Sequence, residues 1–199
     1  LSVHKEGDWK QMKKMRKHSF MTILMVMTLI GILVLAAGCG LTEVPGEPAE
    51  PMPEEKEYSV TLYFAHTGYV ETGDETLPKL VEVRDVSMTA QEGRQYFQLV
   101  DSALRQIPEG TSPAATLIDD SIQVHDVVVD DGTAIVDLSS QGLNNGSLAE
   151  AYVISQIVES LRASFPEIQQ VQFLVDGSVV ESLMGHFGAE EPFKEGIFN

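Results

Sequence analysis

The chain has 199 residues, with 13 Lys and Arg against 30 Asp and Glu, and a formal net charge of −17. This acidity excludes nucleic acid as an expected partner, because few cations are left to neutralise phosphates. A single cysteine excludes an internal disulfide framework and a cysteine-rich zinc module.

The beginning of the chain has the composition of a targeting segment. Residues 1–38 hold six basic side chains, five of them at positions 10–17, and an uncharged apolar run at Phe20–Ala37. A cationic end that stays inside and an apolar run that enters the bilayer are what a secretory signal requires. We therefore predict a lipoprotein signal peptide at residues 1–38, with residues 1–11 as an over-extended start.

Cys39 directly follows this run, in the order Ala36-Ala37-Gly38-Cys39. Small residues let a peptidase fit the backbone, and the thiol is the nucleophile that takes a diacylglycerol. The pattern resembles the bacterial lipobox, although Ala36 stands where Leu is usual. We expect Cys39 to be lipidated, with acyl chains such as palmitate, and to anchor the chain on the extracytoplasmic face of the bacterial cell membrane. Two alternatives are an uncleaved anchor at Phe20–Ala37 and an unmodified thiol.

The next segment is predicted to be a spacer. Residues 40–57 contain four prolines and six glutamates and have almost nothing to bury. Proline favours extended polyproline II geometry and the glutamates repel one another, so such a chain reaches up to about 50 Å. We therefore assign residues 39–57 to a lipid-anchored acidic linker.

Residues 58–199 are long enough for one domain. Alternating apolar residues predict five strands, and apolar residues at helical spacing predict two helices. In chain order these are strands at Tyr58–Ala65 and Leu80–Ser87, a helix after Thr89, strands at Ser121–Val129 and Thr133–Leu138, a helix from Ser147 to Phe165, and a strand at Gln169–Val175. This order predicts an α+β fold in which two helices cover one face of a small mixed or antiparallel sheet.

Local patterns refine the ends of these elements. Thr89 with Glu92, and Ser147 with Glu150, have the spacing of a capping box, in which both side chains bind free backbone N–H groups at the start of a helix. Asp130-Asp131-Gly132 predicts a tight hairpin turn between two strands. On the strand after this turn, Ala134, Val136 and Leu138 are expected to face the core.

Several stretches match one known family. The most specific is Asp131–Ser139, which reads Asp-Gly-Thr-Ala-Ile-Val-Asp-Leu-Ser. The others are Val60–Ala65, Leu80–Arg84, the helix to Phe165-Pro166, Val171–Gly177, and a weaker closing motif at Gly185-His186 with Pro192-Phe193. On these residues the domain resembles the GerMN domain, a sporulation and spore-germination domain of extracytoplasmic lipoproteins. Residues 107–111 only approximate the family pattern. The resemblance implies a fold similar to ring-building modules, and packing or scaffolding rather than chemistry.

The residues offer little for catalysis or metal binding. The three histidines of the domain, His66, His125 and His186, do not have metal-ligand spacing and are expected at the surface or in turns. The acidic residues Asp119, Asp120, Asp126, Asp130 and Asp131 do not follow the order of a calcium loop. Ser139-Ser140 lacks a nucleophile elbow, and Asp137 is expected to bind a loop backbone rather than act as an acid or base. We predict no catalytic residue, no cofactor and no metal.

Together these patterns predict a non-enzymatic envelope lipoprotein that docks to other envelope proteins as a scaffold module. Sporulation or spore germination is the setting that the resemblance implies. The alternative is an extracytoplasmic lipoprotein that binds a cell-wall fragment or a small solute. A hydrolase is the third hypothesis, and it requires His125, His186 and an aspartate to converge in the folded chain.

Overall fold

The computed structural model describes residues 54–198. The predicted signal peptide, Cys39 and most of the predicted linker lie outside the described residues. Within residues 54–198, no helix combines the length and the apolar composition needed to cross a membrane.

The described residues form an α+β domain, as predicted. The elements in chain order are β1 (Glu55–His66), α2 (Thr67–Thr72), β2 (Leu80–Gln91), α3 (Gln95–Asp101), the 3-10 helix η1 (Ala103–Arg105), β3 (Ala114–Ala115), β4 (Val124–Asp130), β5 (Thr133–Leu138), α4 (Ser147–Ser164) and β6 (Gln170–Val175). All five predicted strands and both predicted helices are present, whereas α2, η1 and β3 were not predicted. β4 begins after the predicted Ser121, because the Asp119 carboxylate accepts the Ser121 N–H at 2.9 Å and holds a turn there.

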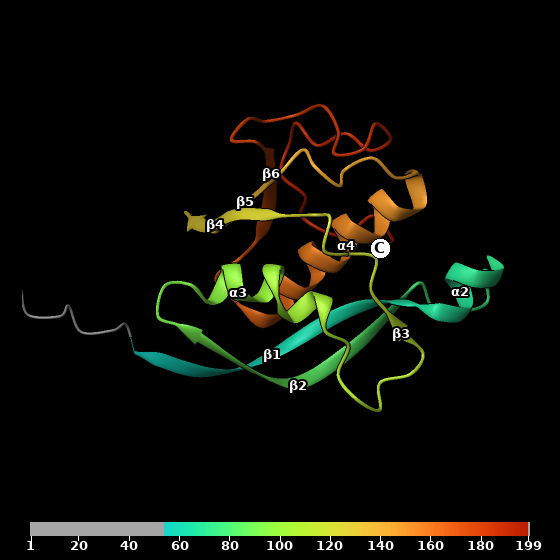
Figure 1. Cartoon of the computed structure of the whole chain (residues 1–199), viewed down its shortest axis with the longest axis horizontal. Helices are drawn as coiled ribbons and strands as arrows, with labels where there is room; N and C mark the ends of the chain where they lie inside the picture. The colour runs from blue at the N-terminus through green and yellow to red at the C-terminus, as the bar shows by residue number, and fades with distance from the viewer. Residues whose placement is uncertain (1–53, 199) are drawn as a thin grey trace, which may run out of the picture. The chain divides into compact units, whose positions relative to one another are not determined.

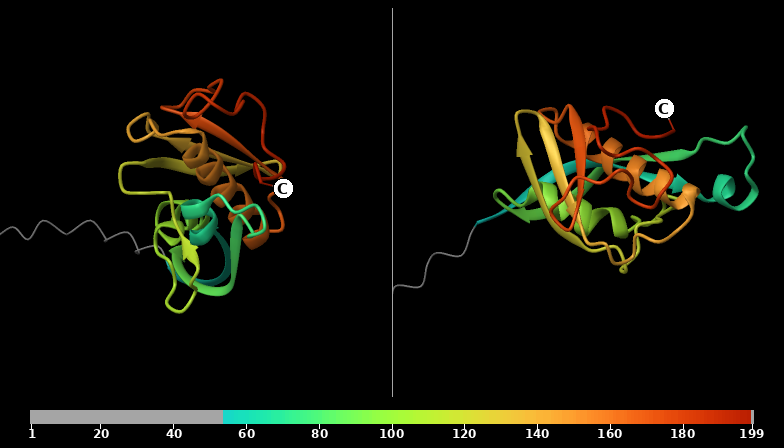
Figure 2. Two further views of the ribbon diagram at one scale, coloured as in Figure 1. Left: turned by 90° about the vertical axis from the view of Figure 1, so that its right-hand side faces the viewer. Right: turned by 90° about the horizontal axis from the view of Figure 1, so that it is seen from above.

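The strands form two three-stranded sheets instead of the single predicted sheet. In the first sheet, β1 lies between β2 and β3, and both run antiparallel to it. In the second, β5 lies between the antiparallel β4 and the parallel β6. The parallel pair follows from the crossover through α4, since parallel strands need a connection that returns the chain. Figure 1 and Figure 2 show α3 and α4 between the two sheets.

The core lies between the sheets and is built from both sheets and both of these helices. Leu62 and Phe64 of β1 are fully buried, as are Ile154 and Leu161 of α4. The buried face of β5 consists of the residues predicted for it, Ala134, Val136 and Leu138. Because α4 has a sheet on each side, 11 of its 18 residues are buried, more than a single apolar stripe would provide.

One edge of β1 is closed by hydroxyl groups of α4. The Ser164 hydroxyl accepts the N–H of Thr61 at 3.0 Å and donates to the Thr61 carbonyl at 2.8 Å. About one turn earlier, the Ser160 hydroxyl accepts the N–H of Tyr63 at 2.8 Å. Backbone polar groups on a strand edge that is shielded from water need hydrogen-bond partners, and this edge is partly buried. The helix therefore covers the part of the β1 edge that β3 leaves unpaired.

The predicted hairpin turn joins β4 and β5. Asp131 and Gly132 both have positive φ values, 42° and 74°. A two-residue turn of type I′ requires positive φ at both central positions, and Gly adopts it without steric cost. The turn prediction is thus confirmed.

The first predicted capping box is wrong. Thr89 lies inside β2, where it pairs with Glu57 of β1, and α3 starts only at Gln95 with no side-chain cap. Glu92 forms an ion pair with Lys56 at 2.7 Å instead. The capping-box pattern is local, and strand pairing with β1 overrides it through Gln91.

Candidate functional site

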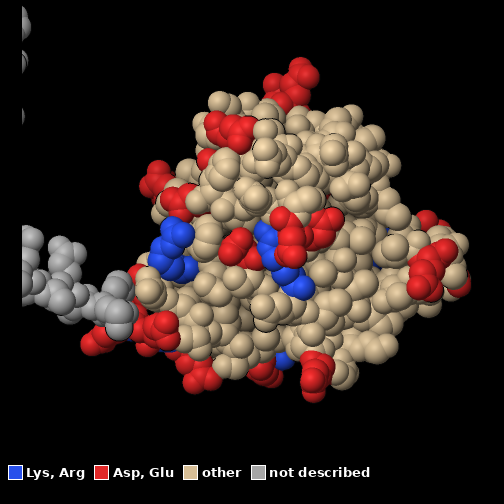
Figure 3. Space-filling view, in the orientation of Figure 1, with Lys and Arg blue, Asp and Glu red and all other residues tan. Residues whose placement is uncertain are grey.

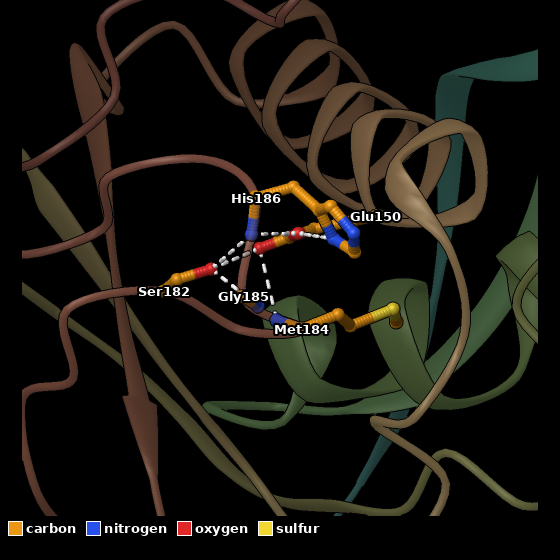
Figure 4. A network of polar contacts seen from close by, with 5 residues as sticks. All are labelled: Glu150, Ser182, Met184, Gly185 and His186. Carbon is orange, nitrogen blue, oxygen red and sulfur yellow. Dashed lines mark hydrogen bonds and ion pairs between the residues drawn. The ribbon is translucent and has the colours of Figure 1, made fainter.

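Glu150, in the first turn of α4, is a carboxylate with no exposed surface. Its partners come from residues 178–198, the irregular stretch after β6 that we name the closing segment. The Ser182 hydroxyl and the Met184 N–H donate to its Oε1 at 2.6 and 2.9 Å. The His186 N–H donates to its Oε2 at 2.9 Å, and His186 Nδ1 lies 3.0 Å from the same oxygen. Figure 4 shows these groups converging on the carboxylate.

The Glu150 carboxylate is held in its charged form. Burial acts to raise its pKa, since removal from water disfavours a charge. The hydrogen bonds from Ser182, Met184 and His186 outweigh burial and lower the pKa of Glu150 below its ordinary value. A buried ion with this many donors is a fixed attachment point for the closing segment.

A serine, a histidine and a glutamate meet at this point, which is also the composition of a hydrolytic triad. In such a triad the imidazole lies between the hydroxyl and the carboxylate and takes the hydroxyl proton. Here Glu150 lies between Ser182 and His186. The Ser182 hydroxyl donates to Glu150, and its oxygen accepts the N–H groups of Gly185 at 2.7 Å and His186 at 3.0 Å. The arrangement holds a loop backbone and does not activate Ser182 as a nucleophile.

The second predicted capping box is also wrong, and this cluster explains why. Helix α4 starts after Gly146 without a side-chain cap, and Ser147 is exposed. The Glu150 carboxylate, which a capping box would direct back to the helix start, binds the closing segment instead. The role of Glu150 was missed because its partners lie more than 30 residues away. The available signal was the Gly185-His186 motif, in which Gly185 has a φ of 93° that glycine adopts readily.

Further along α4, other side chains hold the rest of the closing segment. The Ser155 hydroxyl accepts the Ile197 N–H at 2.9 Å, and Glu159 Oε1 accepts the Gly196 N–H at 2.5 Å. The ring of Phe198 packs on that of Tyr152, with 4.6 Å between centroids. The closing segment is therefore attached along α4 from Glu150 to Glu159, and Ser160 and Ser164 bind β1.

A second polar cluster surrounds His125, near the start of β4. Its Nδ1 lies 3.6 Å from Asp137 and 4.0 Å from Asp176. The Gly177 N–H donates to Asp137 Oδ1 at 2.9 Å, which confirms the prediction that Asp137 binds a loop backbone. Hydrogen bonds from Ser140 lower the pKa of Asp176, and the nearby His125 lowers it further. This cluster ties the ends of β4, β5 and β6 together.

The three histidines have separate partners. His66 precedes α2, and its Nδ1 accepts the Tyr69 N–H at 3.3 Å as the helix cap. His125 contacts two aspartates, and His186 contacts Glu150. A hydrolase with His125, His186 and an aspartate in one site is therefore not the arrangement that the described residues adopt.

The acidic residues weighed as calcium ligands serve other purposes. Asp119 holds the turn before β4, and Asp126 forms an ion pair with Arg94 at 2.8 Å. Asp131 is in the hairpin turn, next to Asp130 at the end of β4. In residues 54–198, no three His, Cys, Asp or Glu side chains are grouped so as to hold a metal ion.

The family model "Germane: Sporulation and spore germination" matches residues 61–181, more than half of the chain. The chain belongs to this family. The resemblance to GerMN domains that the sequence indicated is thereby confirmed. The matched range includes both helices of the core and Glu150, but it ends before Ser182. None of the curated proteins matches the chain.

Solved structures give distant similarities. One is a candidate lipoprotein from Clostridium perfringens, at 22% identity, covering 73% of this chain and 95% of that chain with a TM-score of 0.45. Another is the tandem GerMN domains of the sporulation protein GerM from Bacillus subtilis, at 16% identity, 71% and 46% coverage and a TM-score of 0.46. The first GerMN domain of the same protein gives 16% identity, 71% and 98% coverage and a TM-score of 0.44.

Proposed function

We propose that this Germane-family chain is a non-enzymatic envelope lipoprotein whose domain binds other envelope proteins as a scaffold module during sporulation or spore germination. The arrangement around Glu150 supports this proposal most. Where a serine, a histidine and an acid meet, each group holds a loop, and the carboxylate occupies the position that a catalytic imidazole would need. The family's description supports the setting.

The charge of the domain supports a protein partner of a particular kind. Residues 54–198 carry 25 acidic and 7 basic side chains, a net charge of −18. Six of these seven cations form ion pairs with acidic neighbours. Figure 3 shows acidic groups spread over the face in view and few basic ones. Such a field attracts basic partners and repels anionic surfaces.

In this proposal Cys39 carries the lipid anchor, and the linker holds the domain away from the membrane. The predicted end of the linker at residue 57 is too late, because β1 begins at Glu55 and pairs there with Gln91 of β2. Because the linker and the domain are both acidic, repulsion from anionic headgroups favours an extended linker. The domain is then free to meet other proteins on the extracytoplasmic side.

Photocrosslinking in intact cells tests the proposal. A photoreactive residue is placed at exposed positions on separate elements, Ser87 on β2, Glu109 in the loop after η1, and Val128 on β4. We expect at least one position to give a discrete adduct with another envelope protein, identified by mass spectrometry. If no position gives a protein adduct, although each variant is made in the cells at the level of the wild-type chain, the scaffold function is contradicted. A melting-temperature rise with cell-wall fragments would instead favour the ligand-binding alternative.

A further inference from the structure

The strand edges of the two sheets differ in what covers them. β6 is covered by the closing segment, where Val171 and Phe193 exchange two backbone hydrogen bonds of 2.9 and 2.8 Å. β2 is interrupted by a bulge at Asp85, whose φ is 56°, and carries the ion pair of Glu82 with Arg84. Bulges and charged pairs are means by which natural edges avoid pairing with other chains. β4 also has a bulge, between Val124 and Asp126, but from Asp126 to Asp130 it pairs regularly with β5 and has no backbone partner on its other side in the described residues.

The backbone of β4 offers hydrogen bonds on its outer side. β4 pairs with β5 alone, and no loop in residues 54–198 forms a backbone hydrogen bond with it. Since Asp130 and Thr133 close a two-residue hairpin, the alternation of antiparallel pairs directs the backbone groups of Val127 and Val129 away from β5. The Val127 N–H is bound by the Asp126 carboxylate at 2.9 Å, which agrees with an outward direction. The Val129 N–H and the carbonyls of Val127 and Val129 stay available to another strand.

The side chains of β4 indicate which charge a strand bound at this edge would carry. Along the solvent face of the strand, Asp126, Val128 and Asp130 alternate as acidic, apolar and acidic. Val128 is 48% exposed, which is unusual for a large apolar residue in this domain. On the same face of the sheet, Val128 pairs with Ile135 of β5. An added strand would therefore meet an apolar centre with Asp130, which forms no ion pair in the described residues, on one side and Asp126, which already pairs with Arg94, on the other.

A second copy of this chain does not fit the edge. Antiparallel pairing of two β4 strands centred on Val128 would place Asp126 of each copy opposite Asp130 of the other. Like charges directly opposite on a sheet destabilise the pairing. Arg94 offsets part of this local repulsion because it pairs with Asp126, but the net charge of −18 of residues 54–198 repels a second copy as a whole. The occupant is a different chain of opposite charge.

We propose that the β4 edge, Asp126–Asp130, binds an extended segment of a partner protein by strand addition. The segment has a basic residue, any residue, an apolar residue, any residue and a second basic residue in that order. Its apolar residue covers Val128, one basic residue faces Asp130, and the other faces Asp126, which Arg94 already contacts. The inference rests on the proposed scaffold function and specifies the class of partner.

A peptide binding experiment tests the surface directly. The full chain in detergent is titrated with a fluorescent peptide, Gly-Lys-Thr-Ile-Thr-Lys-Gly, and with the same peptide carrying Glu in place of Lys. We expect the Lys peptide alone to bind, to bind more weakly as salt rises, and to slow hydrogen exchange at residues 126–130. Absence of binding, or protection elsewhere in the domain, overturns the proposal.

Two variants with the same change in charge separate the site from general attraction. Asp130→Lys is expected to weaken binding about fivefold, since it replaces an attraction by a repulsion at the edge. Glu109→Lys, at an exposed loop position, is expected to leave binding within about twofold. Equal effects of the two variants would show that only the net charge attracts the peptide, and would overturn the proposal.

The crosslinking experiment distinguishes failure of this inference from failure of the proposed function. We expect the adduct formed from Val128 to map to a partner segment with the basic and apolar pattern, and to disappear in Asp130→Lys. Adducts from Ser87 or Glu109 without one from Val128 would leave the scaffold function in place and reject the β4 edge as its site.

Discussion

At the scale of single residues, Glu150 joins α4 to the closing segment through one buried side chain. Its charge is buried, and four contacts from the closing segment stabilise it. Removing one partner of a buried charge is costly. The groups that remain lose their hydrogen bond, and water cannot reach them to replace it. This residue therefore links the stability of the domain to the attachment of the closing segment.

We expect Glu150→Gln to lower the free energy of unfolding by about 2–3 kcal/mol, because charge-assisted hydrogen bonds are replaced by neutral ones and one donor loses its acceptor. Urea unfolding of the full chain measures the change. Glu181→Gln, at an exposed position of the closing segment, is the matched control and is expected to change stability by less than about 0.5 kcal/mol. Similar values for the two variants would contradict the role of Glu150.

The lowered pKa of Glu150 also makes its contribution depend on pH. A carboxyl group with a lowered folded pKa binds fewer protons in the folded state than in the unfolded state, so stability rises with pH. Its contribution is complete above the ordinary value of 4.5 and is lost as pH falls through the folded pKa. We expect the stability difference between wild type and Glu150→Gln to be constant near neutral pH and to shrink below about pH 4.5. A difference that stays the same at pH 3 would contradict this.

At the scale of elements, α4 organises the fold. It closes the edge of β1 with Ser160 and Ser164, and it holds the closing segment with Glu150, Ser155 and Glu159. Its sequence predicted a helix with one apolar stripe, which is correct for the element but incomplete for its contacts. A helix with a sheet on each side uses small hydroxyl groups where a purely apolar helix would leave strand backbone unpaired.

Ser160→Ala and Ser164→Ala should each lower stability by about 1–2 kcal/mol, since each leaves a partly buried N–H of β1 without its acceptor. Ser147→Ala serves as a control on the same helix. We expect it to cost less than about 0.5 kcal/mol, because Ser147 makes no capping bond. Thermal or urea unfolding measures all three. A loss of about 1 kcal/mol for Ser147→Ala would restore the capping box that the structure rejects.

The elements with regular periodicity could be predicted from the sequence, and so could the hairpin turn, because Asp131-Gly132 has a direct conformational meaning. The division into two sheets could not, since local patterns do not say which strands pair, nor that hydroxyl groups of α4 bind a strand about 100 residues away. The partners of Glu150 were hidden for the same reason. The closing segment has no repeating pattern, and local rules assigned Glu150 to its own helix.

At the scale of the whole molecule, the proposed arrangement is an acidic domain on an acidic linker, attached to the membrane through Cys39. The domain's charge imbalance and the pairing of most of its cations favour contact with basic proteins over contact with anionic surfaces.

We expect Cys39→Ala to move the chain from the membrane fraction to a soluble or unprocessed form, because the diacylglycerol and further acyl chains provide the stable attachment. Cell fractionation with detection of the full chain measures the distribution, and the wild-type chain is the control. If the variant stays in the membrane fraction after alkaline extraction, the apolar run at Phe20–Ala37 anchors the chain instead.

The central claim is that the domain works by contact and not by turnover. The most direct test compares wild type with Ser182→Ala in intact cells, at a temperature where both are folded, and measures spore formation and germination together with the yield of the partner adduct. The account predicts equal adduct yield and equal function, since the Ser182 hydroxyl only holds a loop. A folded variant that keeps the adduct but loses the cellular function would contradict it, because the hydroxyl would then be doing chemistry.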